Sequence, residues 1–216
     1  MLRAEQPSLP ADFSSVNKLI PNAIYQMRYA TRNNFVGSVV DGYQARQCIL
    51  KTTAATSLQL VAQAAKTQGL KLVLFDCYRP QRAVDHFVRW VNDIEDTKTK
   101  TEYYPNLDKG VLLGDYIAEK SGHSRGYTID LSLAQKNEQG QWQLLDMGGQ
   151  FDLFDPLSNT DNPEVTAQQR ANRYTLKNLM AKGNFSNYPM EWWHYTHEQD
   201  SQQTTKHYYN FPVLAY

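Results

Sequence analysis

Residues 121–133 read Ser121-Gly122-His123-Ser124-Arg125-Gly126-Tyr127-Thr128-Ile129-Asp130-Leu131-Ser132-Leu133. Apolar and polar side chains alternate over the second half of this stretch, and a period of two predicts a β-strand. Asp130 lies on the polar face of the predicted strand. Gly122 and Gly126 allow the loop that carries His123 to turn back toward the strand. We therefore expect His123 and Asp130 to lie close together.

Helices and further strands are predicted on both sides of this stretch. Apolar residues recur at helical spacing over residues 53–66, and Gly69 is suited to end that helix. A short apolar run over residues 70–76 predicts a buried strand, and Pro80 suits the first turn of a second helix. Residues 97–122 are predicted to be mainly loop. Downstream, residues 162–164 resemble a helix start, and Gly183 is its predicted end.

These elements predict a single α+β domain over residues 1–216. Helices and short strands occur without strict βαβ alternation, which favours the α+β class. No internal repeat or low-complexity linker divides the sequence. Residues 1–20 are expected to form an irregular N-terminal extension.

Composition excludes several classes of partner. Twenty-two basic residues balance twenty-two acidic ones, so we expect no extended nucleic-acid-binding face. No apolar stretch approaches the ~20 residues of a membrane helix, so we expect no membrane span. The N-terminus lacks the apolar core of a secretory signal. We predict a cytoplasmic protein, with a periplasmic location as the alternative if an export signal was removed before residue 1.

The two cysteines leave the compartment open. Cys48 and Cys77 are 29 positions apart and could pair in an oxidising compartment. Neither belongs to a CxxC pair, and we expect both to be buried free thiols.

A catalytic metal site is the main chemical prediction. Zinc prefers imidazole nitrogens and carboxylate oxygens in a tetrahedron, and a catalytic site keeps one position for water. His123, Asp130 and His194 could supply three ligands. His197 is a possible rival to His194, whereas His86 and His207 are expected to be structural or exposed.

Two further residues could complete a hydrolytic site. Glu191 is the candidate to take a proton from the attacking water and return it to the leaving amine. Arg79, on the predicted turn between strand and helix, could stabilise a developing oxyanion. Glu191 and His194 would point to opposite faces of a regular strand, so a bend or bulge between them is part of the prediction.

The sequence resembles the D-alanyl-D-alanine dipeptidases of the vancomycin-resistance, VanX-like type, which are zinc D,D-peptidases that share a fold with the zinc domain of Hedgehog proteins. Their SxHxxGxAxD signature is matched by residues 121–130, with Thr128 in place of alanine, and their EWWH signature by residues 191–194. Similar blocks occur at residues 29–37, 76–80, 103–106 and 146–152. The resemblance covers most of the chain in consistent order. It implies a central, mainly antiparallel sheet flanked by helices.

The resemblance also implies a role for each matching residue. One zinc ion per chain would be held by His123, Asp130 and His194, with Glu191 as general base and then acid, and Arg79 polarising the scissile carbonyl of D-Ala-D-Ala. The substrate-binding residues implied are Tyr29 and Asp152 on the ammonium group, Ser121 on the dipeptide, and Asp76 supporting Arg79 or the substrate. The expected partner is a small dipeptide, and the sequence predicts no oligomeric state.

Two alternative functions remain at this point. A D,D- or L,D-carboxypeptidase would use the same zinc site on peptidoglycan stem peptides, but it needs an open channel where a dipeptidase pairs the ammonium group. A zinc-containing binding module would keep the fold without turnover.

Overall fold

The structure, a computed structural model, describes residues 8–216. Its main sheet has six strands, ordered β2-β4-β5-β8-β7, with β6 paired to β5. Only the β2–β4 pair in this sheet is parallel, so the predicted mainly antiparallel arrangement is confirmed. The strands of this sheet are β2 (Ile24–Tyr25), β4 (Lys71–Asp76), β5 (Thr128–Lys136), β6 (Trp142–Leu144), β7 (Phe185–Asn187) and β8 (His194–His197). A separate two-stranded sheet pairs β1 (Phe13–Ser15) with β3 (Ile49–Lys51).

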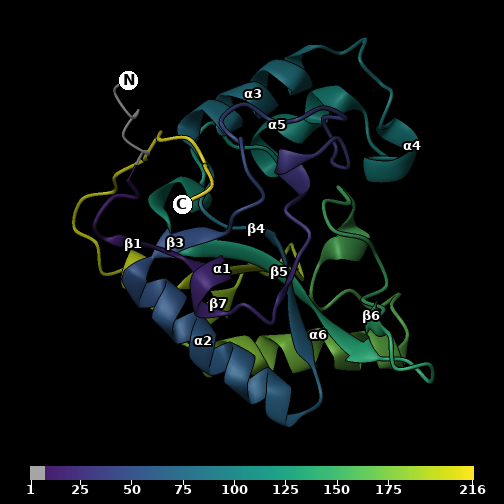
Figure 1. The fold of residues 1–216 in the computed structure, drawn as a ribbon. Coiled ribbons are helices and arrows are strands. Elements are labelled where there is room, and N and C mark those ends of the chain that lie inside the picture. The colour runs from purple at the N-terminus through teal and green to yellow at the C-terminus, as the bar shows by residue number, and fades with distance from the viewer. Residues whose placement is uncertain (1–7) are drawn as a thin grey trace.

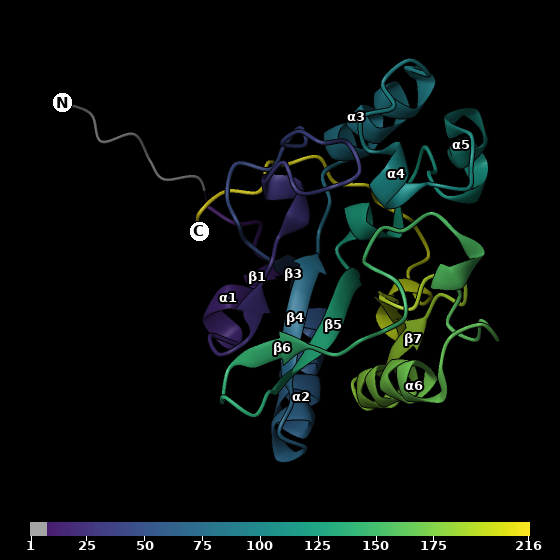
Figure 2. The same ribbon diagram turned by 90° about the vertical axis from the view of Figure 1, so that its right-hand side faces the viewer.

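The helices form two groups around the main sheet. They are α1 (Val16–Leu19), α2 (Thr52–Thr67), α3 (Gln81–Asn92), α4 (Lys100–Tyr103), α5 (Leu112–Asp115) and α6 (Ala167–Ala181). The long helices α2 and α6 lie together below the strands, whereas α3, α4 and α5 gather at the opposite end of the molecule (Figure 1). Figure 2 shows the same separation from the side. The predicted α+β fold with a helix-flanked sheet is confirmed.

Strand β5 runs through the centre of the sheet and brings polar groups into the core. Every residue from Thr128 to Ala134 is buried, although polar and apolar side chains alternate. The apolar face packs into the core through Ile129 and Leu131, which are fully buried. A buried carboxylate such as Asp130 is costly without partners, so the polar face of β5 must meet other polar groups.

The sequence predicted most elements near the site but misplaced the start of α6. This helix begins at Ala167 rather than at residues 162–164. Its N-cap is Thr166, whose side chain accepts a hydrogen bond from the Gln169 amide while the Gln169 side chain accepts one from the Thr166 amide. The side chain of Asn162 instead accepts from the amide of Glu164, a local turn that competes with helix.

The described part of the N-terminal extension is not irregular, contrary to expectation. It contains β1 and α1, and Phe13 and Val16 are buried in the core. Pairing with β3 explains this order, because a terminal segment is held in place when it joins a sheet. Residues 1–7 of the predicted extension lie outside the described residues.

The prediction of free thiols is wrong. Cys48 and Cys77 form a disulfide, with Cα atoms 5.2 Å apart. Cys48 directly precedes β3 and Cys77 directly follows β4, so the fold brings the ends of two strands together. The absence of a CxxC pair therefore said nothing about residues that meet only in the folded chain.

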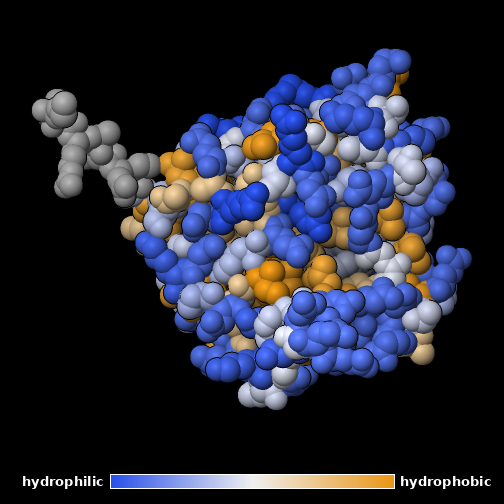
Figure 3. All heavy atoms as spheres, turned by 45° about the vertical axis from the view of Figure 1, so that its right-hand side comes forward, coloured by the Kyte–Doolittle hydropathy of each residue, from blue (hydrophilic) through white to orange (hydrophobic). Residues whose placement is uncertain are grey.

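The surface is mostly hydrophilic in the view of Figure 3, with hydrophobic side chains gathered in a hollow across its middle. Among residues 8–216, no helix combines the length and the apolar character needed to cross a membrane.

Candidate active site

The three candidate metal ligands come from β5, β8 and the turn before β5. Asp130 and His194 are direct neighbours in the antiparallel pairing of β5 with β8. His123 lies on a short 3₁₀ turn, Gly122–Arg125, which ends at Gly126 with a left-handed backbone (φ 83°). A side chain other than glycine would be strained there, so Gly126 allows the turn to return His123 to the strand.

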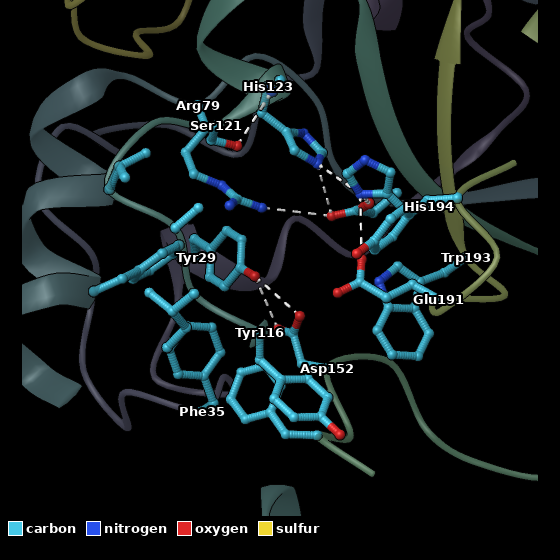
Figure 4. Close-up of a pocket in the computed structure, with 18 of the residues that line it drawn as sticks. Tyr29, Phe35, Arg79, Tyr116, Ser121, His123, Asp152, Glu191, Trp193 and His194 are labelled. Atoms are coloured by element: carbon cyan, nitrogen blue, oxygen red, sulfur yellow. Dashed lines mark hydrogen bonds and ion pairs between the residues drawn. The ribbon is translucent and has the colours of Figure 1, made fainter. Parts of the chain in front are cut away.

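The ligand atoms of these residues meet in one place. His194 Nδ1 lies 3.0 Å from Asp130 Oδ1, and His123 Nε2 lies 3.3 Å from both Asp130 Oδ2 and His194 Nδ1 (Figure 4). Tetrahedral zinc bonds of about 2.0–2.2 Å place neighbouring ligand atoms about 3.3–3.6 Å apart. The cluster is therefore close to the spacing that zinc requires.

Two further observations fit a cation at this point. Asp130 Oδ1 is buried and receives no hydrogen bond of acceptable geometry from the described residues, although His194 Nδ1 is nearby. Burial would raise the pKa of Asp130, but the neighbouring His123 and His194 hold it below its usual range, so the carboxylate is ionised. Burial lowers the pKa of His123, which favours the neutral imidazole that binds a metal.

Glu191 lies beside the cluster, as predicted. Its Oε2 atom is 3.3 Å from His194 Nδ1. A turn separates the two residues, because the His194 amide bonds to the Glu191 carbonyl at 3.3 Å before β8 begins. This confirms the predicted bend. Burial raises the pKa of Glu191 to about 7, the range suited to a group that both accepts and donates a proton near neutral pH.

Arg79 is held by a buried hydrogen-bonded chain. Its Nε donates to Asp76 Oδ2 at 2.9 Å, and the Tyr43 hydroxyl donates to Asp76 Oδ1 at 2.5 Å. The guanidinium also lies over the rings of Tyr29 and Phe87, at 5.1 and 5.0 Å. Its Nη2 is 3.6 Å from Asp130 Oδ2, so Arg79 points toward the candidate metal ligands.

Tyr29 and Asp152 meet at the other end of the pocket (Figure 4). The Tyr29 hydroxyl lies 3.1 and 3.0 Å from the two carboxylate oxygens of Asp152. Asp152 is buried and has a left-handed backbone (φ 65°), an arrangement that aspartate and asparagine tolerate better than most residues. Burial raises its pKa well above the usual range, and the charge of Asp130 adds to this.

One pocket of about 270 Å³ joins both ends of the site. Its volume is at the small end for ligand pockets, which suits a small substrate. The predicted residues that line it are Tyr29, Arg79, Ser121, His123, Asp130, Asp152, Glu191 and His194. Asp76 is fully buried and is not among the lining residues, so of its two predicted roles the structure favours support of Arg79 over contact with substrate.

Sequence reasoning missed two supporting groups. Tyr43 holds Asp76, and the backbone carbonyl of Cys77 accepts a hydrogen bond from His123 Nδ1 at 2.7 Å. No local pattern marks Tyr43. Cys77 lies within the block Asp76-Cys77-Tyr78-Arg79-Pro80, but a role carried by a main-chain carbonyl leaves no signal in residue type. His197 does not join the cluster, since it bonds to Ser57 Oγ at 3.0 Å.

The site is rich in acidic groups. Asp76 and Asp130 lie 2.9 and 3.6 Å from the guanidinium of Arg79, while the carboxyl groups of Asp152 and Glu191 line the same pocket with pKa values raised by burial. Uncompensated buried charge is unfavourable. The site therefore suits cationic ligands at both ends.

Comparison with known proteins decides the family. A family profile described as D-ala-D-ala dipeptidase matches residues 10–214. The chain belongs to this dipeptidase family. Membership confirms the resemblance and the prediction of a peptidase enzyme. Dipeptidase relatives include the D-alanyl-D-alanine dipeptidases of Streptomyces coelicolor (39% identical, covering 95% of this chain and 100% of the relative), Enterococcus faecium (35%, covering 93% and 98%) and Escherichia coli (32%, covering 91% and 86%).

A solved structure is also similar to this dipeptidase-family chain. It is a variant of the vancomycin resistance D,D-pentapeptidase VanY from a VanB-type cassette, in complex with Zn(II). The TM-score is 0.42 and the sequences are 13% identical, with 74% of this chain and 83% of that chain covered.

Proposed function

We propose that the protein hydrolyses the free dipeptide D-Ala-D-Ala to D-alanine, with one zinc ion held by His123, Asp130 and His194. The spacing of the three ligand atoms and the unsatisfied Asp130 Oδ1 support the metal assignment. Zinc in a site of this kind supplies Lewis acidity and a water molecule with a pKa of about 7.

The chain's own residues divide the remaining work. Glu191 takes the proton of the attacking water and delivers it to the leaving amine, a role supported by its pKa near neutrality and its place beside His194. The guanidinium of Arg79 faces the developing oxyanion and stabilises it. Asp76 and Tyr43 hold that guanidinium in position, so little reorganisation is needed during the reaction.

The observation that carries the dipeptide proposal is the buried Asp152. Within the described chain no cation forms an ion pair with it, and Tyr29 satisfies it only in part. A free dipeptide brings an ammonium group, which would pair with this carboxylate and offset the cost of its burial. A blocked or longer peptide has no cation to offer at that position.

The test compares free D-Ala-D-Ala with an acylated tripeptide that ends in D-Ala-D-Ala. We expect D-alanine release from the free dipeptide and little from the blocked peptide. Preference for the blocked peptide would contradict ammonium capture and would favour a carboxypeptidase. No release from either substrate by zinc-loaded protein would contradict the proposed reaction.

The compartment can be proposed from the disulfide. Disulfides persist in oxidising compartments and are rare in the cytosol. The Cys48–Cys77 bond therefore supports the periplasmic alternative over the cytoplasmic prediction. Fractionation of cells that produce the native protein, followed by thiol labelling, tests this: an oxidised pool outside the cytoplasm is expected, and a reduced cytoplasmic pool would contradict it.

A further inference from the structure

The disulfide lies next to the candidate metal site, since the Cys77 carbonyl accepts a hydrogen bond from His123. Its Cys77 half follows β4, whose pairing with β5 ends at Asp76 and Asp130 after a bulge. Beyond that point the Cys77–Tyr78 peptide is held to the start of β3, because the Tyr78 amide bonds to the Ile49 carbonyl at 2.9 Å and the disulfide joins Cys77 to Cys48. Its Cys48 half is anchored, because the Cys48 amide bonds to Asn17 Oδ1 at 2.8 Å and its carbonyl accepts from the Val16 amide at 2.9 Å.

The Cys77 peptide unit orients His123. Its carbonyl accepts the hydrogen bond of His123 Nδ1 at 2.7 Å, which leaves Nε2 to face Asp130 and His194. A fixed acceptor on one ring nitrogen selects the tautomer and the ring orientation at the other nitrogen. The His123 ring is 1% exposed, so no solvent replaces this acceptor.

A competing acceptor lies nearby. Asp76 Oδ2 is 3.6 Å from His123 Nδ1, beyond hydrogen-bond distance, and it already accepts from Arg79. If the Cys77 carbonyl moved away, His123 could turn toward Asp76 and weaken the hold on Arg79. The position of residue 77 therefore affects both the ligand cluster and the guanidinium.

We propose that the Cys48–Cys77 disulfide is a positioning element of the active site, which fixes the Cys77 carbonyl so that His123 presents Nε2 to the metal. This inference rests on the proposed function, since it treats His123 as a ligand. Both cysteines are fully buried, so the bond acts inside the core and not as a surface clasp.

The first test removes the bond without changing residue 77. Cys48→Ala should weaken zinc binding about 10- to 100-fold, the loss typical of a disturbed supporting shell, measured by chelator competition at 25 °C. The double variant Cys48→Ala with Cys77→Ala has no freed thiol that could capture zinc. It should show the same loss of zinc affinity. If the alanine variant does not fold, Cys48→Val, which fills more of the space left by sulfur, replaces it in the same measurement.

The second test reads the imidazole directly in metal-free protein. Nitrogen NMR of the His123 ring should show a proton fixed on Nδ1 in the native protein and a mixture of tautomers in Cys48→Ala. Leu176→Ala serves as the matched control, since Leu176 is a fully buried residue of α6 outside the pocket. It should lower the melting temperature but leave zinc affinity within about twofold, as expected for distant, independent sites.

The outcomes separate this inference from the proposed function. A Cys48→Ala protein with a lower melting temperature but unchanged zinc affinity and an unchanged His123 tautomer would overturn the positioning role. Native protein that binds no zinc or releases no D-alanine would overturn the proposed function instead, and the tautomer measurement would still decide whether the disulfide orients His123.

Discussion

The two ends of the pocket are built in different ways. The ligand end uses neighbouring strands, and Asp130 and His194 are paired across β5 and β8. The acid end depends on loops, and Asp152 adopts a left-handed backbone in the segment between β6 and α6. Strand pairing holds the ligand atoms at the closely defined distances that a metal requires. A loop residue can be exchanged to suit another substrate without disturbing the metal ligands. We therefore propose that the first end carries the chemistry and the second end the substrate specificity.

The largest expected effect is at the ligand end. His123→Ala removes one of the three proposed ligands, so the protein should lose its zinc on dialysis, and its activity should fall to that of chelator-treated native protein. Metal analysis and D-alanine release measure the two effects. Full zinc occupancy in this variant would show that the cluster is not the metal site.

The next effect separates proton transfer from metal binding. Glu191→Gln keeps the size of the side chain but cannot accept the proton, so kcat should fall about 10²- to 10⁴-fold. Zinc content should stay at the native level, because Glu191 is not a proposed ligand. Near-native turnover would remove Glu191 from its role.

A smaller effect is expected at the acid end. Asp152→Asn removes the charge while asparagine still suits the left-handed backbone. Loss of an interaction between charged groups of about 1.5–3 kcal/mol should lower kcat/KM for D-Ala-D-Ala about 10- to 150-fold. The N-acetylated dipeptide, which has no ammonium group, is the control. Asp152→Asn should leave kcat/KM for this substrate unchanged. Equal losses on both substrates would place Asp152 outside ammonium recognition.

The same substitution should have a pH-dependent effect on stability. Burial raises the pKa of Asp152, so the folded protein holds this proton more tightly than the unfolded chain, whose aspartates titrate at about pH 4. The contribution of Asp152 to native stability therefore falls as pH rises above about 4, and Asp152→Asn lacks this contribution. In metal-free protein the variant should melt at a higher temperature than native at pH 8, with a smaller difference at pH 4. A variant that melts lower at pH 8 would contradict the raised pKa.

The smallest effect should lie outside both ends. Thr166→Ala removes the N-cap of α6, a residue that does not line the pocket. It should cost about 1 kcal/mol, which in a chain of this size lowers the melting temperature by about 2–4 °C. Kinetic constants should not change. A large loss of activity would show that the site depends on α6 and that the two-ended description is incomplete.

Local sequence pattern pointed to the ligand end, whereas Tyr29 and Asp152 at the acid end were predicted from the family resemblance, because they are 123 positions apart and meet only in the fold. His123 and Asp130 share one short stretch and His194 another, so local pattern was enough to nominate them. The role of Asp76 stayed open, because only the fold shows that Tyr43 and Arg79 enclose it.

Two of the three failures had a common physical cause, and the third was local. The disulfide joins residues that meet only in the folded chain, and β1 is ordered by its pairing with β3. The α6 start was misjudged because Asn162 and Thr166 both suit an N-cap, and only Thr166 has Gln169 three residues later to complete a capping box.

Anomalous diffraction at the zinc edge, from crystals of protein loaded with one equivalent of zinc, tests the central claim most directly. The account predicts one peak per chain, within about 2.0–2.2 Å of His123 Nε2, His194 Nδ1 and an oxygen of Asp130. A peak elsewhere, such as at His197, or no ordered peak in zinc-loaded crystals would contradict it.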